Sequence, residues 1–172
     1  MKALIVIDMQ HDFIDGTLGT PEAVAIIPNV QKKIDEYVSA GDKVIFTRDT
    51  HFENYLDTQE GKKLPFKHCI WRTPGWCIHK EIQSQFGTAI IDKPTFGFDD
   101  WGAYCDILDV ESIEVCGVCT DICVISNVLA LKSSYPDAEI TVDATCCAGT
   151  TPKNHKAALQ VMKCCQVNVI NE

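Results

Sequence analysis

Short apolar runs, each ended by a turn or polar residue, recur along the whole chain. β-branched residues are frequent in these runs, as is typical of strands that are buried on both faces. The pattern predicts six strands, at residues 3–7, 43–46, 89–91, 113–116, 139–142 and 166–170.

The segments between these runs carry apolar residues at helical spacing. They predict helices at residues 26–39, 78–86, 101–108, 121–133 and 153–164. Because strand and helix alternate, we expect parallel strands that are joined by right-handed crossovers. The sequence therefore predicts a three-layer α/β fold, in which helices cover both faces of one six-stranded, mostly parallel sheet.

The composition fits one globular domain over residues 1–172, with 46% hydrophobic and 23% charged residues. The formal net charge of −9 repels phosphate backbones and anionic lipid surfaces, so we expect no nucleic-acid or membrane partner. The N-terminal apolar run is too short for an export signal and stops at Asp8, which predicts a cytoplasmic protein. In such a protein the ten cysteines are expected to be thiols.

The residues that directly follow the predicted strands carry reactive groups. Asp8 follows the first strand, Lys93 the third and Cys123 the fourth. Ligands of parallel α/β sheets bind at this edge, where the carboxyl ends of the strands meet. A thiol becomes a good nucleophile when a base, a cation or a helix N-terminus favours its thiolate. Together the three residues predict a catalytic cysteine, Cys123, with Asp8 as its base and Lys93 as the cation.

A second group of polar residues follows the second strand. Asp49 and His51 are two positions apart, so in an extended segment they point to the same side. His68 lies on the long connection that follows, and long connections in compact domains are usually functional. One Asp and two His with open positions are typical of a catalytic divalent-metal site. Glu60 and Asp57 are the alternatives for a further ligand.

Five segments that contain these residues carry a family resemblance, at 5–13, 47–51, 68–75, 92–93 and 117–124. They resemble the isochorismatase-like cysteine hydrolase superfamily and, within it, the nicotinamidases. The resemblance runs over nearly the whole chain. It implies an isochorismatase-like, Rossmann-like fold and a homo-oligomer, since relatives commonly form dimers or tetramers.

The resemblance also implies roles for particular residues. The catalytic triad would be Asp8, Lys93 and Cys123. A cis peptide bond between Val118 and Cys119 would aim the backbone amides of Cys119 and Cys123 at the oxyanion of the reaction.

The resemblance further implies a divalent metal bound by Asp49, His51 and His68, and no organic cofactor. Zinc is the first candidate, with iron and manganese as alternatives. In nicotinamidases this metal holds the nitrogen of the pyridine ring and bound water. The candidate walls for such a flat ring are the aromatic residues Phe13, Phe66 and Trp71.

The expected reaction is hydrolysis of a small amide, in first place nicotinamide to nicotinate and ammonia, through an acyl-thioester on Cys123. One alternative keeps the scaffold but takes an N-carbamoyl, ureido or other small amide. Another is a metal or redox centre ligated by Cys116, Cys119 and Cys123. A third is a catalytically silent binding domain of the same fold.

Overall fold

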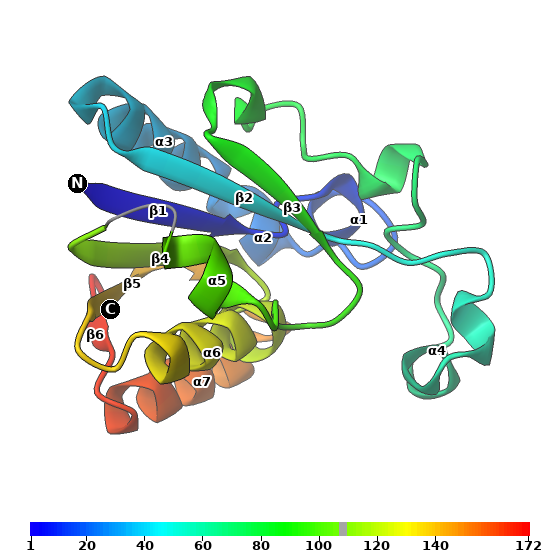
Figure 1. Ribbon diagram of the computed structural model, residues 1–172. Helices are drawn as coiled ribbons and strands as arrows, with labels where there is room; N and C mark the ends of the chain where they lie inside the picture. The colour runs from blue at the N-terminus through cyan, green and yellow to red at the C-terminus, as the bar shows by residue number, and fades with distance from the viewer. Residues whose placement is uncertain (107–109) are drawn as a thin grey trace.

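One sheet of six strands forms the centre of the computed structural model, which describes residues 1–106 and 110–172 (Figure 1). The strand order is β3-β2-β1-β4-β5-β6, and every neighbouring pair is parallel. The predicted α/β fold with a mostly parallel sheet is confirmed. The strands are β1 (Lys2–Ile7), β2 (Lys43–Asp49), β3 (Ala89–Lys93), β4 (Ser112–Val118), β5 (Glu139–Ala148) and β6 (Asn168–Ile170).

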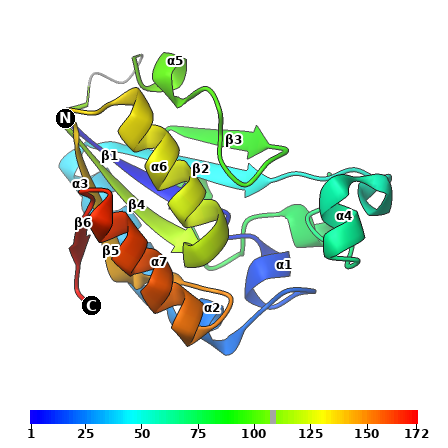
Figure 2. The same ribbon diagram turned by 90° about the horizontal axis from the view of Figure 1, so that it is seen from below.

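Helices cover both faces of this sheet. In Figures 1 and 2, α2 and α3 lie on one face, and α6 and α7 lie on the other with α5 packed against α6. The α-helices are α1 (His11–Ile14), α2 (Pro21–Ala25), α3 (Ile27–Ala40), α4 (Gln59–Lys63), α5 (Trp101–Asp106), α6 (Ile125–Ser134) and α7 (Pro152–Cys164). Short 3-10 turns form at Tyr55–Asp57, Pro74–Trp76 and Ser84–Phe86, and one π-helical turn, η4, forms at Thr120–Val124.

The predicted helix at 78–86 is wrong. Ile78 pairs with Gln10 in an isolated antiparallel bridge, and the backbone N–H of His79 donates to the carbonyl of Met9 at 2.8 Å. This pairing holds the start of the segment in an extended conformation, and only the last three residues, Ser84–Phe86, form a 3-10 turn. Of the predicted helix at 101–108, residues 107 and 108 lie outside the described residues.

The local sequence explains where the longest helix begins and ends. α3 has Pro28 in its first turn and buries Ile27, Val30 and Ile34 on one face against β1 and β2. It ends at Gly41, whose φ of 74° lies in the left-handed region that glycine adopts without strain. The chain then turns directly into β2.

The sheet positions the site through the contact between its two central strands. The chain builds outward from β1 on one side and from β4 on the other, so the crevice between their carboxyl ends is the topological switch point. Gly117 at the end of β4 has a φ of 119°, and a Cβ there would lie 2.1 Å from the carbonyl oxygen of Ile7. Glycine therefore permits β1 and β4 to approach closely where the crevice opens.

Two further observations bear on the sequence predictions. The nine cysteines whose side chains the structure describes are all free thiols, as predicted. None of the helices within residues 1–106 and 110–172 is long and apolar enough to cross a membrane.

A largely buried ion cluster ties α3 to strands β4 and β5. Lys33 Nζ lies 2.6 Å from Glu114 Oε1 on β4 and 2.9 Å from Asp143 Oδ2 on β5. The side chains of Lys33, Glu114 and Asp143 are exposed by only 13%, 13% and 5%. Burial favours the neutral acid at Asp143, but hydrogen bonds from Lys33 and Thr145 outweigh it and lower the pKa of Asp143.

Replacing Lys33 by methionine keeps the stem and leaves two buried carboxylates without their cation. We expect Lys33→Met to lower the free energy of unfolding by about 3 kcal/mol in urea titrations near neutral pH. Lys32→Met is the matched control, because Lys32 is 79% exposed and pairs with Glu36 only at 3.9 Å; its effect should stay below about 1 kcal/mol.

The same cluster predicts a pH dependence. A lowered pKa at Asp143 contributes stability above the pKa of the unfolded carboxyl, about 3.9, and this contribution is lost as the pH falls through the folded pKa. The wild type should therefore lose more stability below about pH 4 than Lys33→Met does. Equal acid sensitivity of the two proteins would show that the cluster does not stabilise the fold.

Candidate active site

Asp8, Lys93 and Cys123 come together at the carboxyl edge of the sheet. Asp8 is the first residue after β1, Lys93 is the last residue of β3, and Cys123 lies in η4 after β4. Lys93 Nζ lies 2.6 Å from Asp8 Oδ2, and both side chains are 0% exposed. Cys123 is 4% exposed and forms part of the wall of an adjoining pocket. The structure thus brings together the three residues predicted as a triad.

The Asp8 carboxylate is held in one orientation. Its Oδ1 accepts a hydrogen bond from the Thr47 hydroxyl at 2.6 Å, and its Oδ2 accepts one from Lys93. The backbone N–H of Asp8 donates to Thr47 Oγ1 at 3.2 Å. Asp8 also has a φ of 49°, which is uncommon for a residue other than glycine and is often found at functional sites.

The electrostatics of the triad keep the resting thiol protonated. Burial raises the pKa of Asp8, against the opposing effect of Lys93. Burial would lower the pKa of Lys93, but the negative charge of Asp8 raises it. Burial and then the Asp8 carboxylate raise the pKa of Cys123 well above its ordinary value. The site therefore holds a thiol beside a carboxylate of raised proton affinity, and not a preformed thiolate.

The turn that carries Cys123 is irregular. The peptide bond between Val118 and Cys119 is cis. The carbonyl of Cys119 accepts hydrogen bonds from the backbone N–H groups of Ile122 and Val124, at 3.0 and 3.1 Å. π-helical turns such as η4 are rare and occur frequently at functional sites. Burial raises the pKa of Cys119 to about 12, so this neighbouring thiol also stays neutral.

Asn127 on α6 fixes this turn, and the sequence analysis did not identify it. Its Nδ2 donates to the carbonyls of Cys123 at 2.8 Å and Phe96 at 3.0 Å. Its Oδ1 accepts from the backbone N–H of Phe98 and from Trp101 Nε1, at 2.9 and 3.0 Å. Asn127 is fully buried and links η4 to the loop that follows Lys93. The available signal was a polar residue four positions after Cys123, among the apolar residues of a predicted helix.

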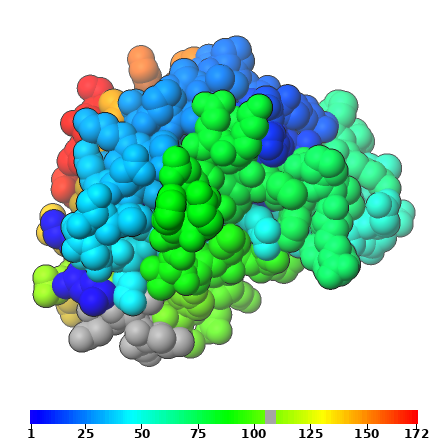
Figure 3. All heavy atoms as spheres, turned by 90° about the horizontal axis from the view of Figure 1, so that it is seen from above, coloured from blue at the N-terminus to red at the C-terminus, as the bar shows by residue number. Residues whose placement is uncertain are grey.

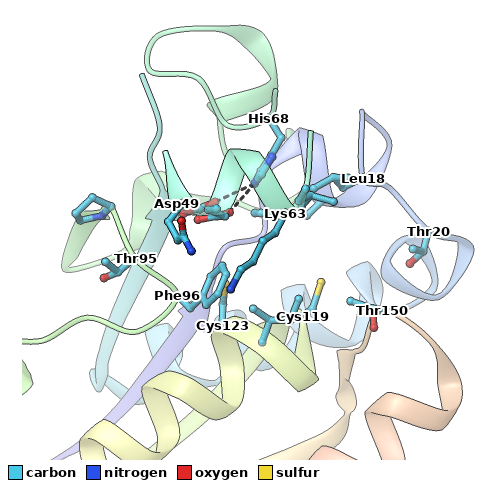
Figure 4. Close-up of a pocket in the computed structure, with 16 residues that line it drawn as sticks. Leu18, Thr20, Asp49, Lys63, His68, Thr95, Phe96, Cys119, Cys123 and Thr150 are labelled. Atoms are coloured by element: carbon cyan, nitrogen blue, oxygen red, sulfur yellow. Dashed lines mark ion pairs between the residues drawn. The ribbon is translucent and has the colours of Figure 1, made fainter. Parts of the chain in front are cut away.

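The four residues of the second predicted group also converge. His51 Nε2 lies 3.0 Å from Asp49 Oδ2 and 3.4 Å from Glu60 Oε1. His68 Nε2 lies 3.5 and 3.6 Å from the same two oxygens (Figure 4). Asp57, the alternative ligand, is not part of this cluster.

The long loop returns to β2 through backbone hydrogen bonds. The N–H of His51 donates to the carbonyl of Cys69 at 2.9 Å, and the N–H of Trp71 donates to the carbonyl of His51 at 2.8 Å. This short bridge places His68 beside His51. The loop also folds into α4, which supplies Glu60.

The four side chains of Asp49, His51, Glu60 and His68, named the metal cluster, fit one divalent metal ion. Asp49 Oδ1 is buried and has no hydrogen-bond partner among the described residues. His68 Nδ1 lies 2.9 Å from the carbonyl of Phe66, so it carries the hydrogen and leaves the Nε2 lone pair facing the cluster. Burial would lower the pKa of His51, but Asp49 and Glu60 raise it to about 9. Carboxylate and imidazole donors in this arrangement suit zinc, iron or manganese.

Gln10 connects the metal cluster to the end of β1. Its Oε1 accepts from the backbone N–H of Asp49 at 2.7 Å, and its Nε2 donates to the carbonyls of Asp49 and Trp76 at 2.9 and 2.8 Å. Gln10 is fully buried and lies two residues after Asp8. It therefore fixes the backbone of a predicted metal ligand relative to the triad. Gln10 lies in the segment 5–13 that carries the family resemblance, but the sequence pattern predicted no role for it.

A cavity of about 690 Å³ lies between the metal cluster and the cysteine turn. Asp49 and His68 line it at one side, and Cys119 and Cys123 line it at the other (Figure 4). Phe13 is also part of its wall, with its ring centroid 5.5 Å from that of His68 in an edge-on contact. The size is within the range of about 300–1,000 Å³ that is usual for small-molecule sites.

Two of the expected aromatic walls are not in this pocket. Phe66 and Trp71 are 56% and 43% exposed, and neither lines the cavity. Trp71 instead packs beside Phe52 and under the guanidinium of Arg72 on the outer side of the loop. Their place in the loop sequence did not reveal which side of the loop they occupy. The wall contains Phe96, which the sequence analysis did not select.

The geometry does not support a cysteine-ligated metal centre. Cys116 is fully buried inside β4, whereas Cys119 and Cys123 line the pocket beyond the end of that strand. The clusters of potential metal ligands within the described ranges contain only His, Asp and Glu side chains.

The chain is similar to known proteins over its full length. The model of the isochorismatase domain family matches residues 2–172. A nicotinamidase/pyrazinamidase of Mycobacterium tuberculosis is 25% identical over 190 residues, which cover 99% of this chain and 98% of the relative. A nicotinamidase of Escherichia coli is 27% identical and covers 81% of each chain.

A solved structure is also similar over the full length. The pyrazinamidase of Pyrococcus horikoshii in complex with zinc superposes with a TM-score of 0.83 at 28% identity, and the match covers 99% of each chain. These relatives are hydrolases of carbon–nitrogen bonds in amides. The chain belongs to the isochorismatase family and is a nicotinamidase-like hydrolase.

Proposed function

We propose that this protein hydrolyses a small carboxamide, in first place nicotinamide, through an acyl-thioester on Cys123. The observation that carries the proposal is the Asp8–Lys93 pair, 2.6 Å apart and sealed from solvent, beside a buried thiol that opens into the pocket. The metal cluster across the same pocket supports a ring with a heteroatom as the substrate. The names of the relatives support the same substrate class.

Attack on the amide begins with a proton transfer. Asp8 takes the proton of the Cys123 thiol while the sulfur attacks the amide carbon. The raised pKa of Asp8 suits it to this step, and Lys93 keeps the carboxylate in place. The oxyanion then accepts hydrogen bonds from the backbone amides of Cys119 and Cys123, each of which contributes about 2.7–4 kcal/mol to lowering the barrier.

The intermediate breaks down in two stages. The proton on Asp8 passes to the leaving nitrogen, the carbon–nitrogen bond breaks, and ammonia departs from the thioester. Asp8 is then a carboxylate again and removes a proton from the water that attacks the thioester. The carbon–sulfur bond breaks, the proton returns to Cys123, and the acid is released.

The other end of the pocket orients the ring. Asp49, His51, Glu60 and His68 would hold a divalent metal, which supplies a Lewis-acid contact for a ring nitrogen when it is bound. Phe13 provides an apolar wall beside His68. A pyridine carboxamide satisfies both ends of the pocket at once, whereas an N-carbamoyl compound leaves the metal cluster without a ring nitrogen.

Cys123→Ala tests the nucleophile. We expect ammonia release from nicotinamide to fall by about 10⁴-fold or more, because the covalent step is lost. Cys119→Ala is the control, since only the backbone of Cys119 has a role in the proposal, and it should keep activity within about tenfold of the wild type. Circular dichroism confirms that both variants fold. Turnover by folded Cys123→Ala, or equal losses in both variants, would contradict the assignment.

His51→Ala tests the metal cluster. The wild type should bind one divalent ion per chain. Loss of a residue that hydrogen-bonds to a metal ligand typically weakens binding by roughly 10–100-fold, and loss of a direct ligand should weaken zinc binding by more than that. Asp57→Ala is the control because Asp57 is outside the cluster. Metal content and titration calorimetry measure the effect. Unchanged zinc affinity in His51→Ala would exclude this metal site. The reason to prefer nicotinamide to an N-carbamoyl compound as the substrate would then be lost.

A further inference from the structure

The pocket contains one charged side chain that the reaction above does not use. Lys63, the last residue of α4, lines the cavity, and its side chain points into it from the side of the metal cluster (Figure 4). We propose that Lys63 binds an anionic group of the substrate, so that the site takes small amides that also carry a carboxylate. This inference rests on the proposed amidase function.

The ammonium of Lys63 has no carboxylate partner in the part of the chain that the structure describes. Glu60, three residues earlier on α4, is directed at the metal cluster, 3.4 Å from His51 and 3.6 Å from His68. The nearby cation Lys67 is already paired with Glu53 at 2.9 Å on the outer side of the loop. Lys63 is therefore available to a ligand.

A second donor lies on the same face of α4. Gln59 is four residues before Lys63, so the two side chains are neighbours on the helix surface, and both line the cavity. Two of the three wall threonines already donate their hydroxyl hydrogens, Thr95 to the carbonyl of Gly97 and Thr150 to Asp121, and the Thr20 hydroxyl accepts from the backbone N–H of Ala23. An ammonium and an amide on one helical turn match the two oxygens of a carboxylate.

α4 is fixed firmly enough to present these groups. The Thr58 hydroxyl caps the helix by accepting from the N–H of Gly61 at 3.0 Å. A Cβ at Gly61 would lie 2.0 Å from the carbonyl oxygen of Tyr55, so glycine allows the helix to pack directly on the buried Tyr55. The α4 segment lies beyond the carboxyl ends of the strands, at one end of the molecule (Figures 1 and 3). It faces the cysteine turn across the pocket (Figure 4).

The other charges in the pocket do not neutralise the positive charge of Lys63. Asp8 and Lys93 neutralise each other. The two carboxylates of the metal cluster, Asp49 and Glu60, would neutralise a divalent ion. The pocket then carries one net positive charge, whereas the whole chain carries −9 and does not attract anions at long range. Selection of an anion must therefore come from the local contact with Lys63.

The cavity also has room for a substituent. Its volume of about 690 Å³ lies in the upper half of the usual range of about 300–1,000 Å³ and exceeds what a single ring with a carboxamide fills. Nicotinamide is neutral and would leave Lys63 without a partner. A ring that bears both a carboxamide and a carboxylate would use the thiol, the metal cluster and Lys63 together.

Ammonia release from two matched pairs of probes tests this inference. One pair is nicotinamide and a pyridine carboxamide with an added carboxylate, and the other is N-carbamoylglycine and its neutral methyl ester. For at least one pair we expect the zinc-loaded wild type to favour the carboxylated member by roughly tenfold in kcat/KM, mainly through KM, as for a charge-assisted hydrogen bond. This preference should shrink at high ionic strength.

Lys63→Met keeps the stem and removes the charge, so the preference should fall by about tenfold, and Lys63→Glu should reverse it. Lys62→Met is the matched control, because Lys62 is exposed like Lys63 and adjacent to it in sequence but lies outside the cavity wall; it should keep the wild-type preference. If the wild type hydrolyses nicotinamide but shows no preference for a carboxylate, or if Lys63→Met keeps the preference, the inference fails and the amidase function stands. If no probe releases ammonia, the amidase function fails and the inference fails with it.

Discussion

The buried ion pair between Asp8 and Lys93 is the constraint on which the rest of the site depends. Removing two charges from water costs several kcal/mol for each ion, and the cost is offset only when geometry and hydrogen bonding are nearly ideal. The sheet supplies that geometry. β2 lies between β1 and β3, so Lys93 must reach across it, and the β2 residue that faces Asp8 is Thr47. Its small side chain leaves space for the lysine stem and donates to the other carboxylate oxygen.

The residues at the two ends of the pocket are both held by the segment that follows β1. Asp8 and Gln10 follow β1 and are two residues apart. Asp8 accepts a hydrogen bond from Lys93, and the Gln10 side chain hydrogen-bonds both the backbone N–H and the backbone carbonyl of Asp49. The cysteine turn is fixed from the opposite direction by Asn127, which also holds the loop after Lys93. A shift of β1 would therefore disturb the base and the metal cluster together. The strand order explains why these residues gather at the switch point between β1 and β4.

The sequence predicted the features that depend on short-range pattern. Apolar runs located the six strands, and the alternation with helices gave the parallel sheet. Asp8, Lys93 and Cys123 could be selected because each follows or ends a strand, and parallel strands bring such positions to one edge. Asp49 and His51 could be selected for the same reason.

Other features depend on how distant segments meet. Residues 78–86 have helical spacing, but the hydrogen bond from His79 to Met9 holds the start of this segment against the end of β1. Gln10 and Asn127 hold backbone groups of distant segments, so the residue pattern marks at most a buried polar position and not its role. The path of the loop after β2 turns Lys63 toward the pocket and leaves Trp71 outside. Loop positions of this kind follow from tertiary contacts, and not from periodicity.

In the proposed reaction the sulfur of Cys123, activated by the Asp8–Lys93 pair, forms a covalent bond to the acyl group. The most direct measurement is acid quench of the enzyme during turnover of nicotinamide, followed by digestion and fragmentation mass spectrometry of the peptide that contains both Cys119 and Cys123. We expect a nicotinoyl group on Cys123 that is absent without substrate and absent in an Asp8→Asn variant. A nicotinoyl group on Cys119, or turnover by an enzyme on which rapid quenching never finds an acyl group, would contradict it.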